Sequence, residues 1–302
     1  MRKHFVLSGP ARAGFVLIFA ALLVLFGGIG CTRDSDRSSE TTQIEFNRII
    51  SAAPSNTEII AALGMGDRLI AVDMYSGGVP GVPSGLPEID FFYPDTEAII
   101  GLEPDIIFAN EINSFGVADN PFKLLGDMGI RVVDIPTSVS IEGIYNDIIT
   151  IAEVLGVEER GEAIVALMKE EIERIAAAAK AAPEKKTVYF EISGPPFMYS
   201  FGRGTFLNEM IEIAGGRNIF DDQNSWFSPS AEEIITRNPD IIFTMNYSWE
   251  DTVAEMKNRT AFQTITAIKE NRVYAIDDNS ASRPSQNILP ALRQMAEGIN
   301  SP

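Results

Sequence analysis

The chain has 302 residues, a formal net charge of −18, one cysteine and one histidine. This acidic balance disfavours binding to nucleic acid or to an anionic membrane surface, because both require an excess of Lys and Arg. Cys31 is the only cysteine, so the chain can form no internal disulfide. His4 is the only histidine and lies in an N-terminal segment that we expect to be removed, so the mature chain would lack the imidazole of a Ser-His-Asp or Cys-His centre or of a His-based metal site. These absences exclude thiol-based and histidine-based catalysis and His-based zinc or manganese sites. We expect no catalytic residue, no resident metal and no cofactor.

The N-terminal 45 residues are predicted to lie outside the fold. A basic start and an apolar run fill residues 1–30, and Cys31 follows at the expected cleavage point of a secretory signal. We expect a signal peptide over 1–30 and a flexible tether over 31–45, with the rest outside the cytoplasm. Loss of residues 1–30 removes three basic residues and takes the net charge from −18 to −21. The alternative is an uncleaved transmembrane anchor, because the apolar run is close to bilayer-spanning length.

Short apolar strands alternate with helices over residues 46–157, which predicts an N-terminal α/β lobe with a mostly parallel sheet. A strand over 48–52 precedes a helix over 54–63, in which Ser55 and Glu58 have capping-box spacing. Further strands are expected at 69–72, 106–109 and 131–135, and further helices at 122–128 and 141–155.

Residues 158–183 carry apolar side chains at spacings of three and four, which predicts one long helix ended by Pro183. Its position between two similar halves indicates a rigid connector. A C-terminal lobe over 184–302 repeats the α/β pattern. Its expected elements are strands at 187–192 and 272–276 and helices at 206–214 and about 285–298. The predicted fold is α/β, with two Rossmann-like lobes and mostly parallel sheets joined by one long rigid helix.

A repeated segment supports this two-lobe organisation. Residues 96–109 return as residues 231–244, with eight of fourteen positions identical and an offset of 135 residues. Each copy is predicted to be a helix, a Pro-Asp break and a buried strand. Glu97 and Glu232 occupy the same place near the start of the two helices. The duplication predicts a cleft between the lobes and a pair of symmetry-related surface acids.

Several motifs resemble, in order, those of ABC-importer substrate-binding proteins for iron–siderophores, vitamin B12 and haem (helical-backbone, class III periplasmic binding proteins). Residues 48–64 resemble that family's opening and 102–107 its LxPDLV block. Residues 214–220 resemble its AGGxN block and 283–285 its RPG-like turn. The resemblance covers about residues 44–295 and implies two α/β lobes joined by one long helix.

The resemblance implies a lipid-anchored, extracytoplasmic binding protein rather than an enzyme. It would capture a ferric-siderophore or a corrinoid/haem-type ligand between its lobes and deliver it to an ABC importer. In the family, one acid on each lobe docks into arginine pockets of the permease dimer, which works with ATPase subunits; Glu97 and Glu232 match those acids. Cys31 matches the lipidated cysteine, although Gly28 stands where leucine is usual. We expect a monomer that contacts membrane only through its lipid anchor.

Helix capping is the alternative role for both acids, and we prefer capping for Glu233, three residues after Ser230. Aromatic residues in the predicted loops are candidates for ligand contact, because aromatic faces suit a flat macrocycle or catecholate. Phe91 and Trp226 each lie six residues before a repeat glutamate, and in the vitamin B12-binding relative tryptophans at matching positions flank the corrin. The other aromatic candidates are Tyr75, Tyr93 and Phe197. Ordinary packing is the alternative for all of them.

Arg283 is the main polar candidate, because siderophore-binding relatives often place an arginine of this turn against the anionic chelate. Its alternatives are a solvated arginine or a salt bridge between the lobes. Arg203 is a second cation that could face the cleft. Two other functions stay open: a binder of another chelated metal or an oxyanion, and an extracytoplasmic hydrolase that uses paired carboxylates.

Overall fold

The computed structural model describes residues 45–90, 92–111, 121–180, 184–246 and 251–301. Contacts group residues 43–302 into one compact unit. The expected signal peptide, Cys31 and nearly all of the expected tether lie outside the described residues. Among the residues that are described, no helix is both long enough and apolar enough to cross a membrane.

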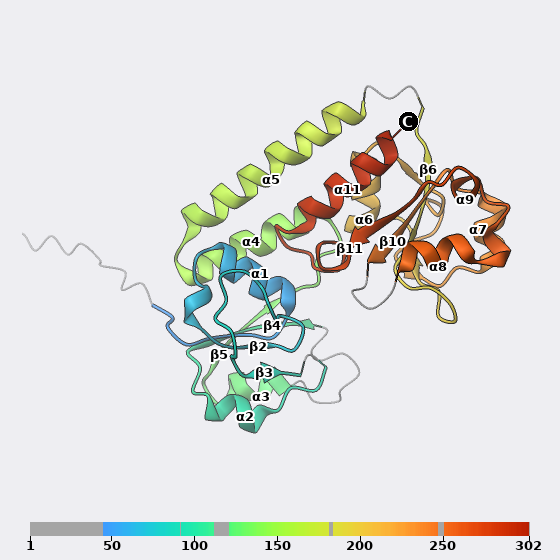
Figure 1. The fold of residues 1–302 in the computed structure, drawn as a ribbon. Coiled ribbons are helices and arrows are strands. Elements are labelled where there is room, and N and C mark those ends of the chain that lie inside the picture. Colours follow the sequence, from blue (N-terminus) through green and yellow to red (C-terminus); the bar gives the residue numbers. More distant parts are fainter. Residues whose placement is uncertain (1–44, 91, 112–120, 181–183, 247–250, 302) are drawn as a thin grey trace, which may run out of the picture. The chain divides into compact units, whose positions relative to one another are not determined.

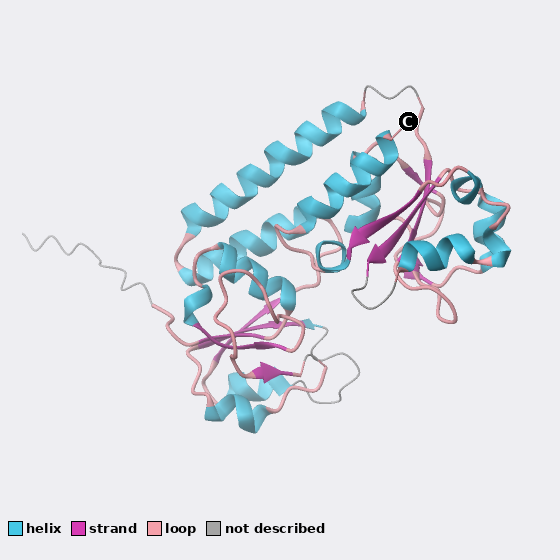
Figure 2. Ribbon diagram, in the orientation of Figure 1, coloured by secondary structure: helices cyan, strands magenta, loops and turns pink. Residues whose placement is uncertain are grey.

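The first sheet has five parallel strands in the order β3-β2-β1-β4-β5 (Figures 1 and 2). Its strands are β1 Ile49–Ser51, β2 Leu69–Asp73, β3 Glu88–Ile89, β4 Ile106–Asn110 and β5 Arg131–Ile135. The helices of this part are α1 Pro54–Ala62, α2 Thr96–Gly101, α3 Pro121–Asp127 and α4 Ile141–Leu155.

The second sheet has four parallel strands in the order β11-β10-β6-β8. Its strands are β6 Thr187–Glu191, β8 Arg217–Asn218, β10 Ile241–Asn246 and β11 Val273–Asp277. A separate antiparallel pair joins β7 Ser200–Phe201 to β9 Trp226–Phe227. The helices here are α6 Phe206–Ile213, α7 Ala231–Arg237, α8 Thr252–Asn258, α9 Thr266–Lys269, α10 Asp278–Ser282 and α11 Ile288–Asn300.

Both faces of each sheet are buried, as the continuous apolar strands require. In β4, Ile106 and Phe108 point into one core while Ile107 and Ala109 point into another, because successive side chains of a strand alternate. The core on the outer face of each sheet is local: α2 and α3 cover the first sheet, and α7 to α9 cover the second. The inner core is shared between the two halves, and it includes residues of α1, α4, α5 (Glu158–Ala179), α6 and α11.

The predicted long helix is α5, Glu158–Ala179, and it lies along α4 and α11 (Figure 1). Near its start, Arg160 Nη1 donates to the carbonyl oxygen of Leu63 at 2.8 Å, at the end of α1. In its middle, the carboxylate of Glu171 accepts from Arg293 Nε of α11 at 2.6 Å. The helix therefore contacts helices of both lobes, and the two-lobed α/β fold with one long joining helix is confirmed.

The aspartate in each copy of the sequence repeat forms hydrogen bonds that the sequence pattern did not predict. Asp105 Oδ2 accepts from the backbone N–H groups of Asn47 and Arg48, both at 2.9 Å, beside the start of β1. Asp240 Oδ2 accepts from the backbone N–H of Thr187 at 2.8 Å, at the start of β6. The aspartate of each Pro-Asp pair thus fixes the start of the neighbouring strand.

The helix ends show one correct prediction and one error. At α7, Ser230 and Glu233 form a complete capping box, as expected from their spacing. At α1 the predicted Ser55–Glu58 box is wrong: Ala53 is the N-cap without a side-chain hydrogen bond, and Pro54 opens the helix. The carboxylate of Glu58 instead accepts hydrogen bonds from Arg283 and Ser285, 225 and 227 residues later in the sequence.

Two differences occur near that end. The last helix begins at Ile288 rather than near residue 285, because the Ser285 hydroxyl accepts from the backbone N–H of Asn287 ahead of it. The short helix α10 was not predicted.

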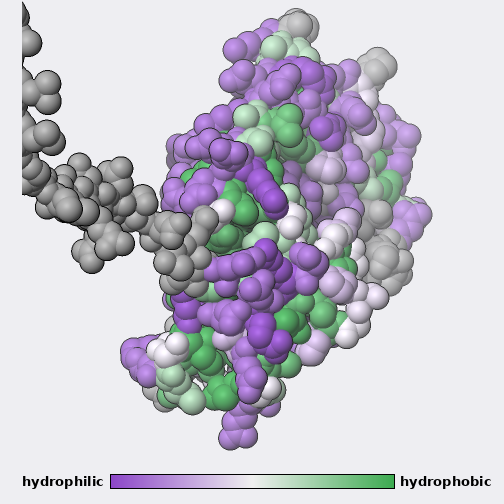
Figure 3. All heavy atoms as spheres, turned by 90° about the vertical axis from the view of Figure 1, so that its left-hand side faces the viewer, coloured by the Kyte–Doolittle hydropathy of each residue, from purple (hydrophilic) through white to green (hydrophobic). Residues whose placement is uncertain are grey.

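The face drawn in Figure 3 is largely hydrophilic with smaller apolar areas, as the charged composition requires.

Candidate functional site

The carboxyl ends of strands of the first sheet meet the segment at the end of α10 at one small pocket of about 80 Å³. Residues after β1, at the end of β4 and after β5 form one side, and the last residue of α10 with the two residues after it forms the other. The lining residues are Ala53, Pro54, Ser55, Asn110, Thr137, Ser282, Arg283 and Pro284. Open α/β sheets bind ligands outside the carboxyl ends of their strands, so this junction is the natural place for a ligand.

An ion pair crosses this junction. Arg283 Nη1 donates to Glu58 Oε1 at 2.9 Å, and Arg283 Nη2 donates to the carbonyl oxygen of Tyr75 at 2.8 Å. Ser285 Oγ donates to the second oxygen of Glu58 in a short hydrogen bond. The Glu58 side chain is 5% exposed and that of Arg283 is 12% exposed. The salt bridge between the lobes, one of the alternatives for Arg283, is therefore present.

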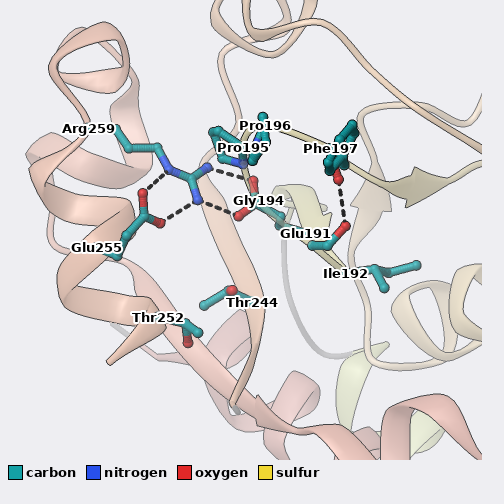
Figure 4. A pocket seen from close by; sticks show the side chains of 11 residues that line it. Glu191, Ile192, Gly194, Pro195, Pro196, Phe197, Thr244, Thr252, Glu255 and Arg259 are labelled. Atoms are coloured by element: carbon teal, nitrogen blue, oxygen red, sulfur yellow. Dashed lines mark hydrogen bonds and ion pairs between the residues drawn. The ribbon is translucent and has the colours of Figure 1, made fainter. Parts of the chain in front are cut away.

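A second and larger pocket, of about 380 Å³, lies at the carboxyl end of β6 and beside α8 (Figure 4). Glu191 is the last residue of β6, and the loop that follows it runs along the pocket to Phe197. The lining residues are Glu191, Ile192, Ser193, Gly194, Pro195, Pro196, Phe197, Thr244, Thr252, Glu255 and Arg259.

Arg259 in this pocket is held by two carboxylates. Its Nη1 and Nη2 donate to the two oxygens of Glu191 at 2.7 and 2.6 Å, and its Nε donates to Glu255 Oε1 at 2.7 Å. Nη2 also contacts the second oxygen of Glu255. Figure 4 shows the guanidinium lying between the two acids. Gly194 permits this approach, because a Cβ there would lie 2.5 Å from Arg259 Nη2.

The electrostatics of the trio follow from its burial. Burial raises the pKa of Glu191, whose side chain is 2% exposed, while the bidentate contact with Arg259 opposes that rise. Burial acts to lower the pKa of Arg259, but its hydrogen bonds to Glu191 and Glu255 outweigh this effect and raise that pKa. Arg259 therefore stays cationic, with its charge satisfied inside the protein.

The predicted aromatic residues lie in different places. Tyr75, 47% exposed, lies beside Arg283 at the lobe junction, and Phe197, 83% exposed, lines the larger pocket. Tyr93, 76% exposed, instead lines a separate hollow between β3 and α2. Trp226 is half-buried and stacks on Tyr199 at 6.5 Å between ring centroids. Phe91 lies outside the described residues.

The two repeat glutamates occupy equivalent positions in the first turns of α2 and α7. Asp95 caps α2 and Ser230 caps α7, so neither Glu97 nor Glu232 is the capping side chain. Both glutamates are exposed, and neither forms an ion pair with another described residue. Their carboxylates are available to a partner.

Three residues of the larger pocket were not predicted from the sequence: Glu191, Glu255 and Arg259. The only available signal was the i, i+4 spacing of Glu255 and Arg259, which usually indicates an exposed helix pair. The partner that makes the pair a site feature, Glu191, lies 68 residues away in the sequence. Within the described residues, no group of three or more His, Cys, Asp and Glu side chains could hold a metal ion.

A family model described as periplasmic binding protein matches residues 49–280. The chain belongs to the periplasmic binding protein family. Its members are substrate-binding transport proteins, so this chain is an extracytoplasmic binding protein of the ABC-transporter type, as the order of its motifs predicted. Permease and ATPase partners and a small-molecule ligand follow from that assignment.

Individual relatives agree with the family. An uncharacterized ABC transporter substrate-binding lipoprotein of Bacillus subtilis, YvrC, is 31% identical over 271 residues, covering 88% of this chain and 84% of that protein. The vitamin B12-binding protein of Vibrio parahaemolyticus is 28% identical, covering 84% of this chain and 90% of that protein. A solved structure of a possible iron-binding periplasmic protein from Staphylococcus epidermidis matches with TM-score 0.75 and 31% identity, covering 85% and 100%.

Proposed function

We propose that this periplasmic binding protein captures a flat corrinoid-type macrocycle at the carboxyl ends of its two sheets and delivers it to an ABC importer. The observation that carries the proposal is the pocket at the lobe junction, which takes its lining from strand ends of the first sheet and from the end of α10 and the turn after it. Exposed aromatic rings at Tyr75, beside the junction, and at Phe197, in the larger pocket at the end of β6, offer apolar faces that suit a planar ligand. The vitamin B12-binding relative supports a corrinoid in particular.

Delivery would use the paired glutamates. Glu97 and Glu232 are exposed, equivalent in the two lobes and without an internal ion-pair partner among the described residues. Carboxylates of this kind suit bidentate contact with arginine, one on each of two permease subunits. We further propose that the protein is a monomer without enzymatic activity, anchored to a membrane by lipid on Cys31.

A ferric chelate is the second candidate ligand, favoured by the iron-binding description of the Staphylococcus epidermidis relative. A thermal-shift screen with cyanocobalamin, haemin and a panel of ferric siderophores separates the candidates. We expect cyanocobalamin to raise the melting temperature most. Stabilisation by a ferric siderophore alone would replace the corrinoid with an iron chelate, and no shift with any of them would overturn both.

A further inference from the structure

The charge of the site is set by two arginines that are already paired. Arg259 in the larger pocket and Arg283 at the lobe junction are the only Lys or Arg side chains among the described residues that line either pocket. Each is nearly buried, with side chains 11% and 12% exposed. Each donates to a glutamate that is itself almost fully buried, Glu191 or Glu58.

The larger pocket carries more acid than base. Arg259 faces two carboxylates, Glu191 and Glu255, and its Nε, Nη1 and Nη2 atoms all donate to them. An anionic ligand group could reach this guanidinium only by displacing Glu191 or Glu255. Displacing Glu191 would leave a buried carboxylate unpaired, which is strongly unfavourable, and Glu255, which is 40% exposed, would keep its negative charge beside the pocket.

The rest of the chain supplies few further positive charges that could attract an anionic ligand to these pockets. The internal stretches outside the described residues, at 91, 112–120, 181–183 and 247–250, contain no Lys or Arg in the sequence. Arg203 is exposed but lines neither pocket. The whole chain has a net charge of −18, so the long-range field also repels anions.

We infer that the Glu191–Arg259–Glu255 trio makes this site select by charge, accepting a macrocycle with a neutral, amide-bearing or cationic periphery and rejecting one with several carboxylates. The inference rests on the proposed function and narrows its ligand class. Within the trio, Glu255 is the specificity-determining residue whose substitution should disturb the stability of the protein least, because its side chain is 40% exposed and lies on a helix surface.

We call this preference for a periphery without carboxylates the charge rule. A matched pair of corrinoids tests it: dicyanocobinamide, with an amide periphery, and dicyanocobyrinic acid, with carboxylates on the same ring. Calorimetric titration of the protein with each is expected to show at least about a tenfold tighter Kd for the amide form, since like charges in contact are costly. Glu255→Gln is expected to narrow that preference severalfold by relieving Arg259 of one carboxylate.

The control is Glu270→Gln, which removes one acid from another Glu–Arg pair, with Arg272, outside both pockets; the Glu270 side chain is 47% exposed. This variant should keep the wild-type preference. Equal affinity for the two corrinoids, or tighter binding of the carboxylate form, would overturn the charge rule while leaving corrinoid binding intact. Absence of binding to either corrinoid would overturn the proposed function, and the charge rule with it.

Discussion

Arg283 Nη1 lies 2.9 Å from Glu58 Oε1, and this contact joins the loop before the last helix to the first helix of the fold, 225 residues earlier in the chain. The same carboxylate accepts from Ser285, and the same guanidinium donates to the carbonyl oxygen of Tyr75. The two lobes are therefore connected by a polar network beside the small pocket as well as by α5. A rigid connecting helix and a buried ion pair together favour small movements between the lobes.

Removing one member of this pair should destabilise the protein. Arg283→Met leaves Glu58 buried without its cation, and we expect a loss of about 3 kcal/mol in the free energy of unfolding, measured with urea. The double variant Arg283→Met with Glu58→Gln should recover part of that loss. Arg272→Met, which breaks the more exposed pair with Glu270, is the control and should cost less than about 1 kcal/mol. Equal losses in the two single variants would show that the buried Glu58–Arg283 pair contributes no more to the free energy of unfolding than the more exposed Glu270–Arg272 pair.

Asp147 of α4 should make stability depend on pH. Burial raises the pKa of Asp147 to about 6, and the hydrogen bond from Ser138 Oγ at 2.6 Å only partly offsets that rise. The folded state therefore binds more protons than the unfolded state between about pH 4 and 6, so this group lowers stability as pH rises through that window. Asp147→Asn should raise the free energy of unfolding by about 2 kcal/mol at pH 8 and by little at pH 4. A gain that is the same at both pH values would contradict this assignment.

The two serines at helix starts should behave differently. Ser230→Ala removes the capping box of α7 and should cost about 1 kcal/mol of stability. Ser55→Ala removes no cap, because α1 begins without a side-chain cap, and it should cost clearly less. Urea unfolding of both variants gives the comparison, and a larger loss for Ser55→Ala would contradict the observed helix ends.

Charge reversal at the paired glutamates should separate delivery from capture. In the variant Glu97→Lys with Glu232→Lys, we expect uptake through the importer to be abolished while the ligand Kd stays within about twofold, because neither residue lines the two pockets at the strand ends. The control Glu162→Lys with Glu170→Lys makes the same charge change on exposed positions of α5. If the control blocks uptake equally, net charge rather than docking explains the loss. A fall in ligand affinity in the first variant would place the glutamates at the ligand instead.

The sequence was sufficient for the architecture because its signals are local. Continuous apolar strands, helix stops such as Gly156 in the left-handed conformation, and the 96–109 repeat predicted the longer strands of both sheets and the joining helix. The shortest elements escaped prediction: β3, β7, β8 and β9 have two residues each, too few to show a period. The duplicated aspartates Asp105 and Asp240 were visible in the pattern, but their contacts to neighbouring strands were not.

The site was less predictable because its contacts join distant parts of the chain. The spacing of Ser55 and Glu58 matched a capping box, yet tertiary partners 225 and 227 residues away engaged the glutamate instead. The Arg259–Glu191 pair has no local signature for the same reason. Aromatic residues were visible as a group, but only the fold separates Phe197 in a pocket from Trp226 packed on Tyr199.

The most direct test of the account is calorimetric titration of the protein with cyanocobalamin, alongside Phe197→Ala and the control Leu167→Ala, an exposed apolar residue on α5. We predict one cyanocobalamin per chain, binding weakened about tenfold by Phe197→Ala through loss of an aromatic contact, and no change with Leu167→Ala. Absence of heat with cyanocobalamin, together with saturable binding of a ferric siderophore, would contradict the account.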